Sequence, residues 1–445
     1  MDVEEFGRRH LAAGTPDDEI VRLMQGEILD VKCCRVSASY AESFARAVLA
    51  EVKNSTGLSG DLYEFEPSGS TMGEFGVGSR GSGDFFAHRE LARIIGSTDA
   101  AVGVDEMDDA GAVRAGGTYI ITTVDGMHSR LSDFPFLAGF HVTRATLRDV
   151  YVMGARPIAL LSDIHVADDG DVAKIFDYTA GVSAVGEAMG VPLVTGSTLR
   201  IGGDMVLGNR LTGCVGAVGV TDHLTARKQI RPGDVLLMTE GAGGGTIATA
   251  AIYSGFPEVV EETINLHFLK AAEALIAADI LPAIHAMTDV TNGGLRGDAY
   301  EMAETAGCRI VVVEDDLRTL VQPQVLAMLD ALEIDYLGVS LDALLVVAPR
   351  EAAPAIVRVV EAAGVRMREI GYVEEGTPES VLSIGGEIHD FTPRFRESAY
   401  TPVKKVVDEE KRDFEEMKTG VERAATAALA KKERILERLR KEYSS

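Results

Sequence analysis

The feature that most constrains the fold is an alternation of strand-like and helical apolar patterns that begins near residue 118. Strands are expected at 119–123, 158–164 and 235–239, and long helices at 136–153 and 172–189. A second block of the same kind continues to about residue 390. Such alternation is typical of α/β proteins, in which helices cover a sheet. It predicts two unequal α/β halves joined near residue 225.

The ends of the chain differ from this alternating part. Residues 1–60 read as a helical extension, and the tail from residue 401 carries 12 Lys/Arg and 10 Asp/Glu residues in a chain of net charge −26. We expect the tail to form a long helix that packs on the body or on a second subunit, and that could bind a protein partner. The predicted segments are 1–60, 61–224, 225–395 and 396–445.

The charge excludes some function classes. With 69 Asp/Glu against 43 Lys/Arg, the field of the protein repels phosphate backbones, so broad nucleic-acid binding is not expected. No apolar run approaches the roughly 20 residues that a membrane span needs, and the start of the chain lacks the apolar core of a secretory signal. We therefore expect a cytoplasmic protein. Four cysteines are too few for a disulfide framework or a zinc site: Cys33, Cys34, Cys214 and Cys308.

Isolated aspartates at strand ends or beside glycines are the main chemical signal. They are Asp108, Asp109, Asp125, Asp149 and Asp289. Mg²⁺ is commonly held by one or two carboxylates together with substrate phosphates, so carboxylates that meet from distant positions would make such a site. The alternative is that these residues only cap turns in a chain rich in acids. Spacing alone does not decide between the two.

Glycine-rich segments are the second signal. The segment 241–246 follows a strand and opens a helix, so its backbone N–H groups could bind an anion. Residues 195–198 are interpreted as either a phosphate-binding turn or a structural turn. Residues 68–83 are either a linker or a loop that closes on a ligand. His128, three residues after Asp125, is a possible general acid or base, with a structural role as the alternative.

At these motifs the chain resembles the aminoimidazole ribonucleotide synthetase-like (PurM-like) superfamily of ATP-dependent enzymes. Asp108–Val113 resembles the Gly-Asp-Asp-Ala-Ala-Val element of its thiamine-monophosphate kinase and selenophosphate synthetase branches, and Thr123–Asp125 resembles their Thr-Thr-Asp. Asp149–Pro157 is similar to their Asp-Leu-x-x-Met-Gly-Ala-x-Pro. Asp289–Leu295 resembles the Asp-Val-Thr-Gly-Phe-Gly-Leu of selenophosphate synthetase and the matching motif of HypE. Thr98–Val102 is an alternative match to the first element.

The resemblance implies a two-domain fold in which the N-terminal domains of two subunits form a dimer barrel. It also implies ATP and Mg²⁺ as cofactors, and transfer of the γ-phosphoryl group to an oxygen of a small-molecule acceptor. The implied metal ligands are Asp108, Asp109, Asp125 and Asp149. The implied catalytic residues are Asp289 and His128. The implied nucleotide contacts are Gly81, Gly83, Gly196, Ser197, Thr198, Gly243 and Gly244.

Departures from the superfamily pattern leave the branch open. Cys33 and Cys34 lie outside a glycine-rich loop, unlike the reactive residue of selenophosphate synthetase, and the chain ends without the terminal Cys of HypE. Ser197 stands where several branches have Asp. An uncharacterised branch is therefore expected. The competing hypotheses are a nucleotide-binding assembly or regulatory protein without turnover, and a metabolite-phosphate binding module without ATP.

Overall fold

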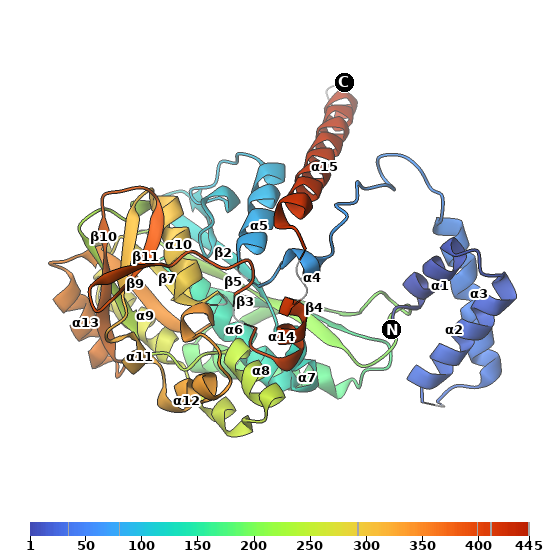
Figure 1. Cartoon of the computed structure of the whole chain (residues 1–445), viewed down its shortest axis with the longest axis horizontal. Coiled ribbons are helices and arrows are strands. Elements are labelled where there is room, and N and C mark those ends of the chain that lie inside the picture. The colour runs from blue at the N-terminus through green and yellow to red at the C-terminus, as the bar shows by residue number, and fades with distance from the viewer. Residues whose placement is uncertain (34, 80, 292, 398, 410–411, 444–445) are drawn as a thin grey trace.

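The computed structural model describes residues 1–443 except residues 34, 80, 292, 398, 410 and 411, so Cys34 lies outside the described residues. It contains two β-sheets with helices packed on them and additional helices at both ends of the chain (Figure 1). The expected α/β class and the extra terminal helices are confirmed. Across the described residues, no helix is both long and apolar enough to cross a membrane.

The first sheet has five strands in the order β1-β2-β5-β3-β4. Their bounds are β1 Gly111–Ala115, β2 Thr118–Gly126, β5 Leu211–Thr221, β3 Arg156–Val166 and β4 Leu193–Arg200. Helices α6 (Pro135–Val152) and α7 (Ala173–Met189) both pack on this sheet. The expected turn at 195–198 is wrong, because these residues belong to β4, an edge strand in which every residue is exposed. Strand β4 pairs only with β3, and its few apolar residues do not mark it as a strand in the sequence.

Helices α6 and α7 cross in direct backbone contact. A Cβ atom on Gly139 would lie 2.1 Å from the carbonyl oxygen of Tyr178, and one on Gly181 would lie 2.2 Å from that of Phe136. Only glycine permits this approach, which fixes α6 against its neighbours. The contact with α7 therefore fixes the position of α6 between the two halves of the body.

The second sheet has seven strands in the order β12-β11-β8-β10-β6-β9-β7. Their bounds are β6 Asp234–Thr239, β7 Ala286–Val290, β8 Arg309–Val313, β9 Ala343–Pro349, β10 Met367–Glu374, β11 Glu379–Ile384 and β12 Glu387–Asp390. Strand β10 was not expected from the sequence, because its register shifts between Glu369 and Gly371 and interrupts the alternation. Edge strand β7 packs against α6 of the first half.

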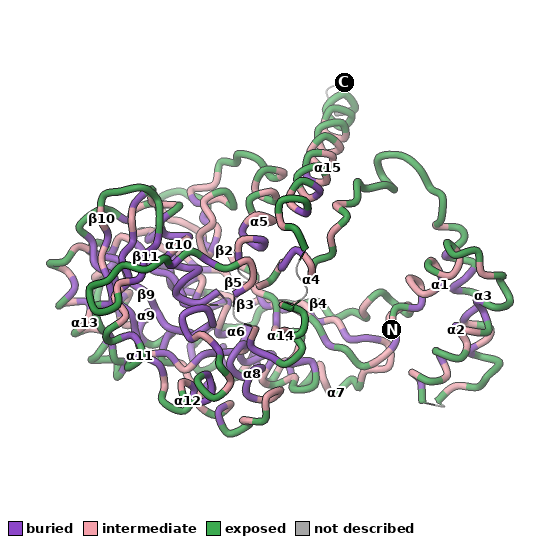
Figure 2. The backbone as a smooth tube through the Cα atoms, in the orientation of Figure 1, coloured by how far each residue is buried: buried purple, intermediate pink, exposed green. Residues whose placement is uncertain are grey.

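Helices of the second half follow the apolar pattern of the sequence. They are α8 Gly245–Ser254, α9 His267–Ala277, α10 Gly294–Ala306, α11 Leu317–Leu320, α12 Pro323–Ala331 and α13 Ala353–Ala362. The buried residues gather in the body formed by the two sheets and these helices (Figure 2). One hydrophobic cluster extends across both halves, because α9 and β7 of the second half meet α6.

The N-terminal extension is a small three-helix unit of α1 (Val3–Ala12), α2 (Asp17–Val31) and α3 (Ala38–Ser55). It stands beside the body in Figure 1 and has its own apolar core, to which the body contributes Leu207. The side chain of Lys32 is buried and its Nζ lies 2.7 Å from Asp168 and 2.9 Å from Asp169. This ion-paired lysine ties the unit to the first half.

The C-terminal arm, residues 391–443, runs along the body before its last helix projects away. The backbone N–H of Ser82, at the start of α5 (Ser82–Ile95), donates to the carbonyl oxygen of Arg394 at 3.0 Å. In the second half, Arg296 donates to Glu397 at 2.7 Å in a buried pair. The arm continues through α14 (Pro402–Glu409) and α15 (Phe414–Tyr443), whose far end projects away from the body (Figure 1).

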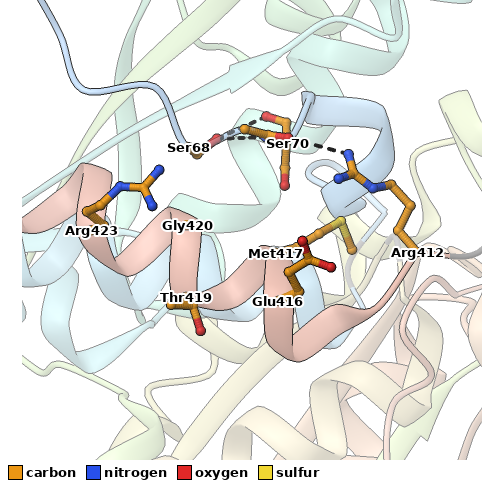
Figure 3. Close-up of a pocket in the computed structure, with 9 residues that line it drawn as sticks. Ser68, Ser70, Arg412, Glu416, Met417, Thr419, Gly420 and Arg423 are labelled. Carbon is orange, nitrogen blue, oxygen red and sulfur yellow. Dashed lines mark hydrogen bonds between the residues drawn. The ribbon is translucent and has the colours of Figure 1, made fainter.

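Helix α15 is held by the connector that precedes α4 (Met72–Phe75). Figure 3 shows the connector at Ser68 and Ser70 lying over the helix at Gly420, beside a pocket of about 370 Å³. A Cβ atom on Gly420 would lie 2.1 Å from the carbonyl oxygen of Ser68. Arg423 donates to the carbonyl oxygen of Pro67 at 3.0 Å. The arm therefore depends on a glycine at its point of closest approach.

Replacement of Gly420 by alanine tests this attachment. We expect Gly420→Ala to push α15 off the connector, with a local cost of about 1–3 kcal/mol typical of overpacking. Amide hydrogen exchange should then quicken in α15 and in residues 66–70. Gly26→Ala on α2 is the control, because nothing lies within 4 Å of that position and alanine favours helix by about 1 kcal/mol. Equal exchange in the two variants would contradict the assignment.

Candidate functional site

Helix α6 carries the charged residues that face the second half. Asp149 lies near its C-terminal end, where Thr123 of β2 donates to the carboxylate at 2.8 Å. Thr123 and Ile121 are two residues apart and therefore lie on the same face of β2. Ile121 is fully buried, so this is the face that packs on α6. The strand thereby brings Asp125, two residues further on, to the same side of the sheet as Asp149.

Three of the predicted aspartates act electrostatically on Asp149 at the junction of the two halves. The pKa of Asp149 is raised well above its ordinary value, first because its surroundings remove it from water and then because Asp289, Asp125 and Asp109 repel its negative charge. Asp289 comes from β7 and is buried. Asp149 is therefore within electrostatic reach of three other predicted aspartates, and their joint role as a metal site stays a prediction.

Arg227 is one residue at this junction that the sequence did not reveal. It is buried, and its guanidinium lies 2.8 Å from Asp109 and 3.0 Å from Glu301 of α10. Its backbone N–H donates to Asp108 at 3.0 Å. Burial raises the pKa of Asp108 to about 7 against the opposing effect of Arg227. The segment around Arg227 looks like an ordinary polar connection between two halves, so no local pattern marks it.

Two further arginines connect α6 to the second half. Nε of Arg148 lies 3.0 Å from Asp289, and both Arg148 and Arg144 pair with Asp342 in the interior. Arg144 also donates to the carbonyl oxygen of Gly243 at 2.8 Å. Asp342 has φ of 59°, a left-handed conformation that non-glycine residues seldom adopt. Its position is therefore set by these contacts, and sequence reasoning did not single it out.

His128 lies against the glycine-rich start of α8. Its Nε2 is 3.1 Å from the hydroxyl of Thr246, and a Cβ atom on Gly245 would lie 2.7 Å from the ring. Burial lowers the pKa of His128 to about 4, helped by the positive charges of Lys404 and Arg148. The imidazole is therefore neutral at neutral pH. The structure places it next to the 241–246 loop, close to Gly243 and Gly244.

Other predicted nucleotide contacts lie elsewhere. Gly81 begins α5 and packs against the arm, where an added Cβ atom would be 2.3 Å from the carbonyl oxygen of Phe395. Gly83 packs equally closely on Phe75. Gly196, Ser197 and Thr198 lie on β4, three strands from β2, which is about 14 Å at the usual strand spacing. These residues are not part of the aspartate cluster.

Mg²⁺ requires several oxygen ligands around it. Within the described ranges, no three His, Cys, Asp or Glu side chains are close enough together to hold a metal ion. Asp108 and Asp109 already face Arg227, although one buried carboxylate oxygen of Asp108 has no hydrogen-bond partner there. Burial, and then repulsion by neighbouring carboxylates, raises the pKa of Asp149, and a cation would relieve the repulsion. The residues therefore fit an ion shared with phosphate oxygens rather than one caged by protein alone.

Known proteins resemble this chain over different shares of its length. An uncharacterized protein of Methanocaldococcus jannaschii is 52% identical over 99% of this chain and 98% of its own length. The selenide, water dikinase of Myxococcus xanthus is 30% identical over 49% of this chain and 63% of its own length. The hydrogenase maturation protein HypE, solved in complex with ATP, has the same fold: TM-score 0.53, 19% identity, 62% of this chain and 85% of that chain.

Two family descriptions match adjacent parts of the sequence. The N-terminal domain of AIR synthase related proteins matches residues 107–221. The C-terminal domain of the same proteins matches residues 231–383. The first match contains the aspartates around α6, and the second contains Asp289 and the glycine-rich loop before α8. The chain belongs to the AIR synthase related protein family.

Proposed function

We propose that the chain is an enzyme that binds Mg²⁺-ATP at the junction of its two halves and transfers the γ-phosphoryl group to an oxygen of a small-molecule acceptor. The convergence of Asp109, Asp125, Asp149 and Asp289 carries this proposal. The family supports it, as does the ATP complex of HypE, a protein of the same fold. Phosphoryl transfer demands mainly positioning and neutralisation of charge, which a set of carboxylates with Mg²⁺ provides.

Each group has a distinct part in the proposed site. Asp125 and Asp149 would hold Mg²⁺, which supplies positive charge to the phosphate oxygens. Asp108 and Asp109, paired with Arg227, fix the geometry behind them. Asp289, oriented by Arg148, faces the acceptor. A neutral His128 can accept a proton from the acceptor.

The glycine-rich segments are assigned by their place in the fold. Gly243 and Gly244 precede α8, whose first N–H groups can donate to phosphate oxygens. Gly81 and Gly83 start α5, and we propose that this segment covers the nucleotide. Residues 196–198 lie on the edge strand β4. We propose that β4 takes part in subunit pairing instead.

Nucleotide binding tests the metal assignment. We expect Asp125→Asn and Asp149→Asn each to reduce the Mg²⁺-dependent affinity for a non-hydrolysable ATP analogue at least tenfold, because each removes one of the carboxylates assigned to the ion. Isothermal titration with and without Mg²⁺ measures the effect. Asp99→Asn is the matched control, since Asp99 is exposed and belongs to the alternative motif at 98–102. Unchanged affinity in both site variants would refute the assignment.

A second function is favoured by the parts of the chain outside the family matches. The three-helix unit and α15 lie beyond residues 107–383, as expected of an assembly protein that binds ATP without turnover. Acceptor-dependent release of ADP separates the two proposals. An assembly protein would bind the ATP analogue but release no ADP with any acceptor.

We further propose that the open face of the first sheet pairs with the same face of a second copy in a barrel. Val124 of β2, Ile158 of β3 and Leu199 of β4 lie on this face and are exposed, Val124 by 67%. Apolar side chains collected on one sheet face mark an interaction surface.

Subunit pairing can be measured by sedimentation velocity. We expect the wild-type protein to be a dimer, and Val124→Glu to be a monomer, because two carboxylates would be buried at the barrel interface. Ile388→Glu is the control, because Ile388 is also exposed but lies on β12, the edge strand of the second sheet. A wild-type protein that stays monomeric at tens of micromolar would contradict the barrel.

A further inference from the structure

The guanidinium of Arg144, on α6, is enclosed by the second half. The side chain is buried, and Nη1 donates to the carbonyl oxygens of Thr263 at 2.5 Å and Asn265 at 2.7 Å. Nη2 donates to the carbonyl oxygen of Gly243 at 2.8 Å and pairs with the carboxylate of Asp342. One planar, rigid group thereby contacts three separate segments, so its position is fixed from several sides.

This contact orients the peptide group between Gly243 and Gly244. In a planar trans peptide the N–H points opposite to the C=O. Because the carbonyl oxygen of Gly243 faces Arg144, the N–H of Gly244 points away from the guanidinium. A Cβ atom on Gly244 would lie 3.2 Å from Nη2 of Arg144. This agrees with the orientation, since the carbonyl oxygen and the next Cα lie on the same side of a trans peptide bond.

The N–H of Gly244 remains available as a donor. Gly244 directly precedes α8, and no acceptor for its N–H is seen among the described residues. The N–H of Gly243, in contrast, donates to the carbonyl oxygen of Leu341 at 2.8 Å. The loop therefore ties one N–H into the fold and leaves the next one for another acceptor.

The direction of this peptide is not fixed by side chains of its own. Gly243 has φ of 76°, and neither glycine carries a Cβ atom, so the backbone on both sides of the peptide has wide conformational freedom. A flipped peptide would present the carbonyl oxygen of Gly243 in place of the N–H of Gly244, and that oxygen would repel a phosphate oxygen. The hydrogen bond from Arg144 favours the orientation that presents the donor.

We propose that Arg144 is a positioning residue of the nucleotide site, because it holds the peptide so that the N–H of Gly244 donates to a phosphate oxygen of ATP. The inference rests on the proposed function and extends it to a residue that acts on the nucleotide only through the loop. Asp342 supports Arg144 and also pairs with Arg148, which contacts Asp289. The same ion pairs therefore set the positions of the loop and of Asp289.

Substitution of Arg144 in the full chain tests this role. We expect Arg144→Lys to weaken binding of a non-hydrolysable ATP analogue with Mg²⁺ about tenfold, the scale of one hydrogen bond to a charged group. Lysine keeps the charge but lacks the planar fork that reaches the carbonyl and the carboxylate together. Isothermal titration measures the affinity. Arg309→Lys is the control, because the Arg309 guanidinium pairs with carboxylates of β10 and β11.

Amide hydrogen exchange separates a positioning role from a loss of stability. At concentrations of the analogue that saturate each protein, we expect residues 241–247 to be protected in the wild type and less protected in Arg144→Lys. If that variant does not fold, Asp342→Asn replaces it, since asparagine also tolerates the left-handed φ of 59° at this position. It removes the charge that holds Arg144, and we expect about a threefold loss of affinity, the effect of a weakened hydrogen bond.

Unchanged affinity of Arg144→Lys for the analogue would overturn the proposal. Protection of residues 241–247 equal to that of the wild type would do so as well, as would an equal loss of affinity in Arg309→Lys. Failure of the proposed function has a separate signature, because the wild-type protein itself would then not bind the analogue with Mg²⁺. The positioning role would be refuted together with it.

Discussion

The site depends on buried ion pairs between α6 and the second half. The side chains of Arg144 and Arg148 extend from α6 and form ion pairs with Asp289 and Asp342 in the interior. Removing charges from water is costly, and a buried pair is tolerated only where geometry and further hydrogen bonds compensate. These pairs therefore favour one relative placement of the two halves. Asp149, next to Arg148 on the same helix, is thereby positioned opposite Asp289.

Around this junction the aspartates have different electrostatic partners. Arg227 neutralises Asp108 and Asp109, while the carboxylate of Asp149 is repelled by Asp289, Asp125 and Asp109. A cation would relieve this repulsion. A nucleotide bound through Mg²⁺ therefore suits the part of the junction where Asp149 lies.

The parts added to the family fold connect distant regions. Lys32 joins the N-terminal unit to Asp168 and Asp169. The arm holds Ser82 through Arg394 and the second half through Glu397 and Arg296. Because the arm contacts both halves, a shift of the second half would displace the glycine-rich start of α5. The arm therefore couples the proposed nucleotide cover to the acceptor side.

Local pattern by itself determined the α/β class, most long helices and the helical ends, because periodicity and turn chemistry are properties of neighbouring residues. It marked the aspartates near α6 but did not decide between a metal site and turn caps. The tertiary structure decided which charges meet. Arg227 lies 118 residues from Asp109, and Arg144 lies 198 residues from Asp342. Residues 195–198 pair as a strand only because β3 is beside them. Electrostatic attraction and strand pairing act through space, so the sequence contains their members but not their partners.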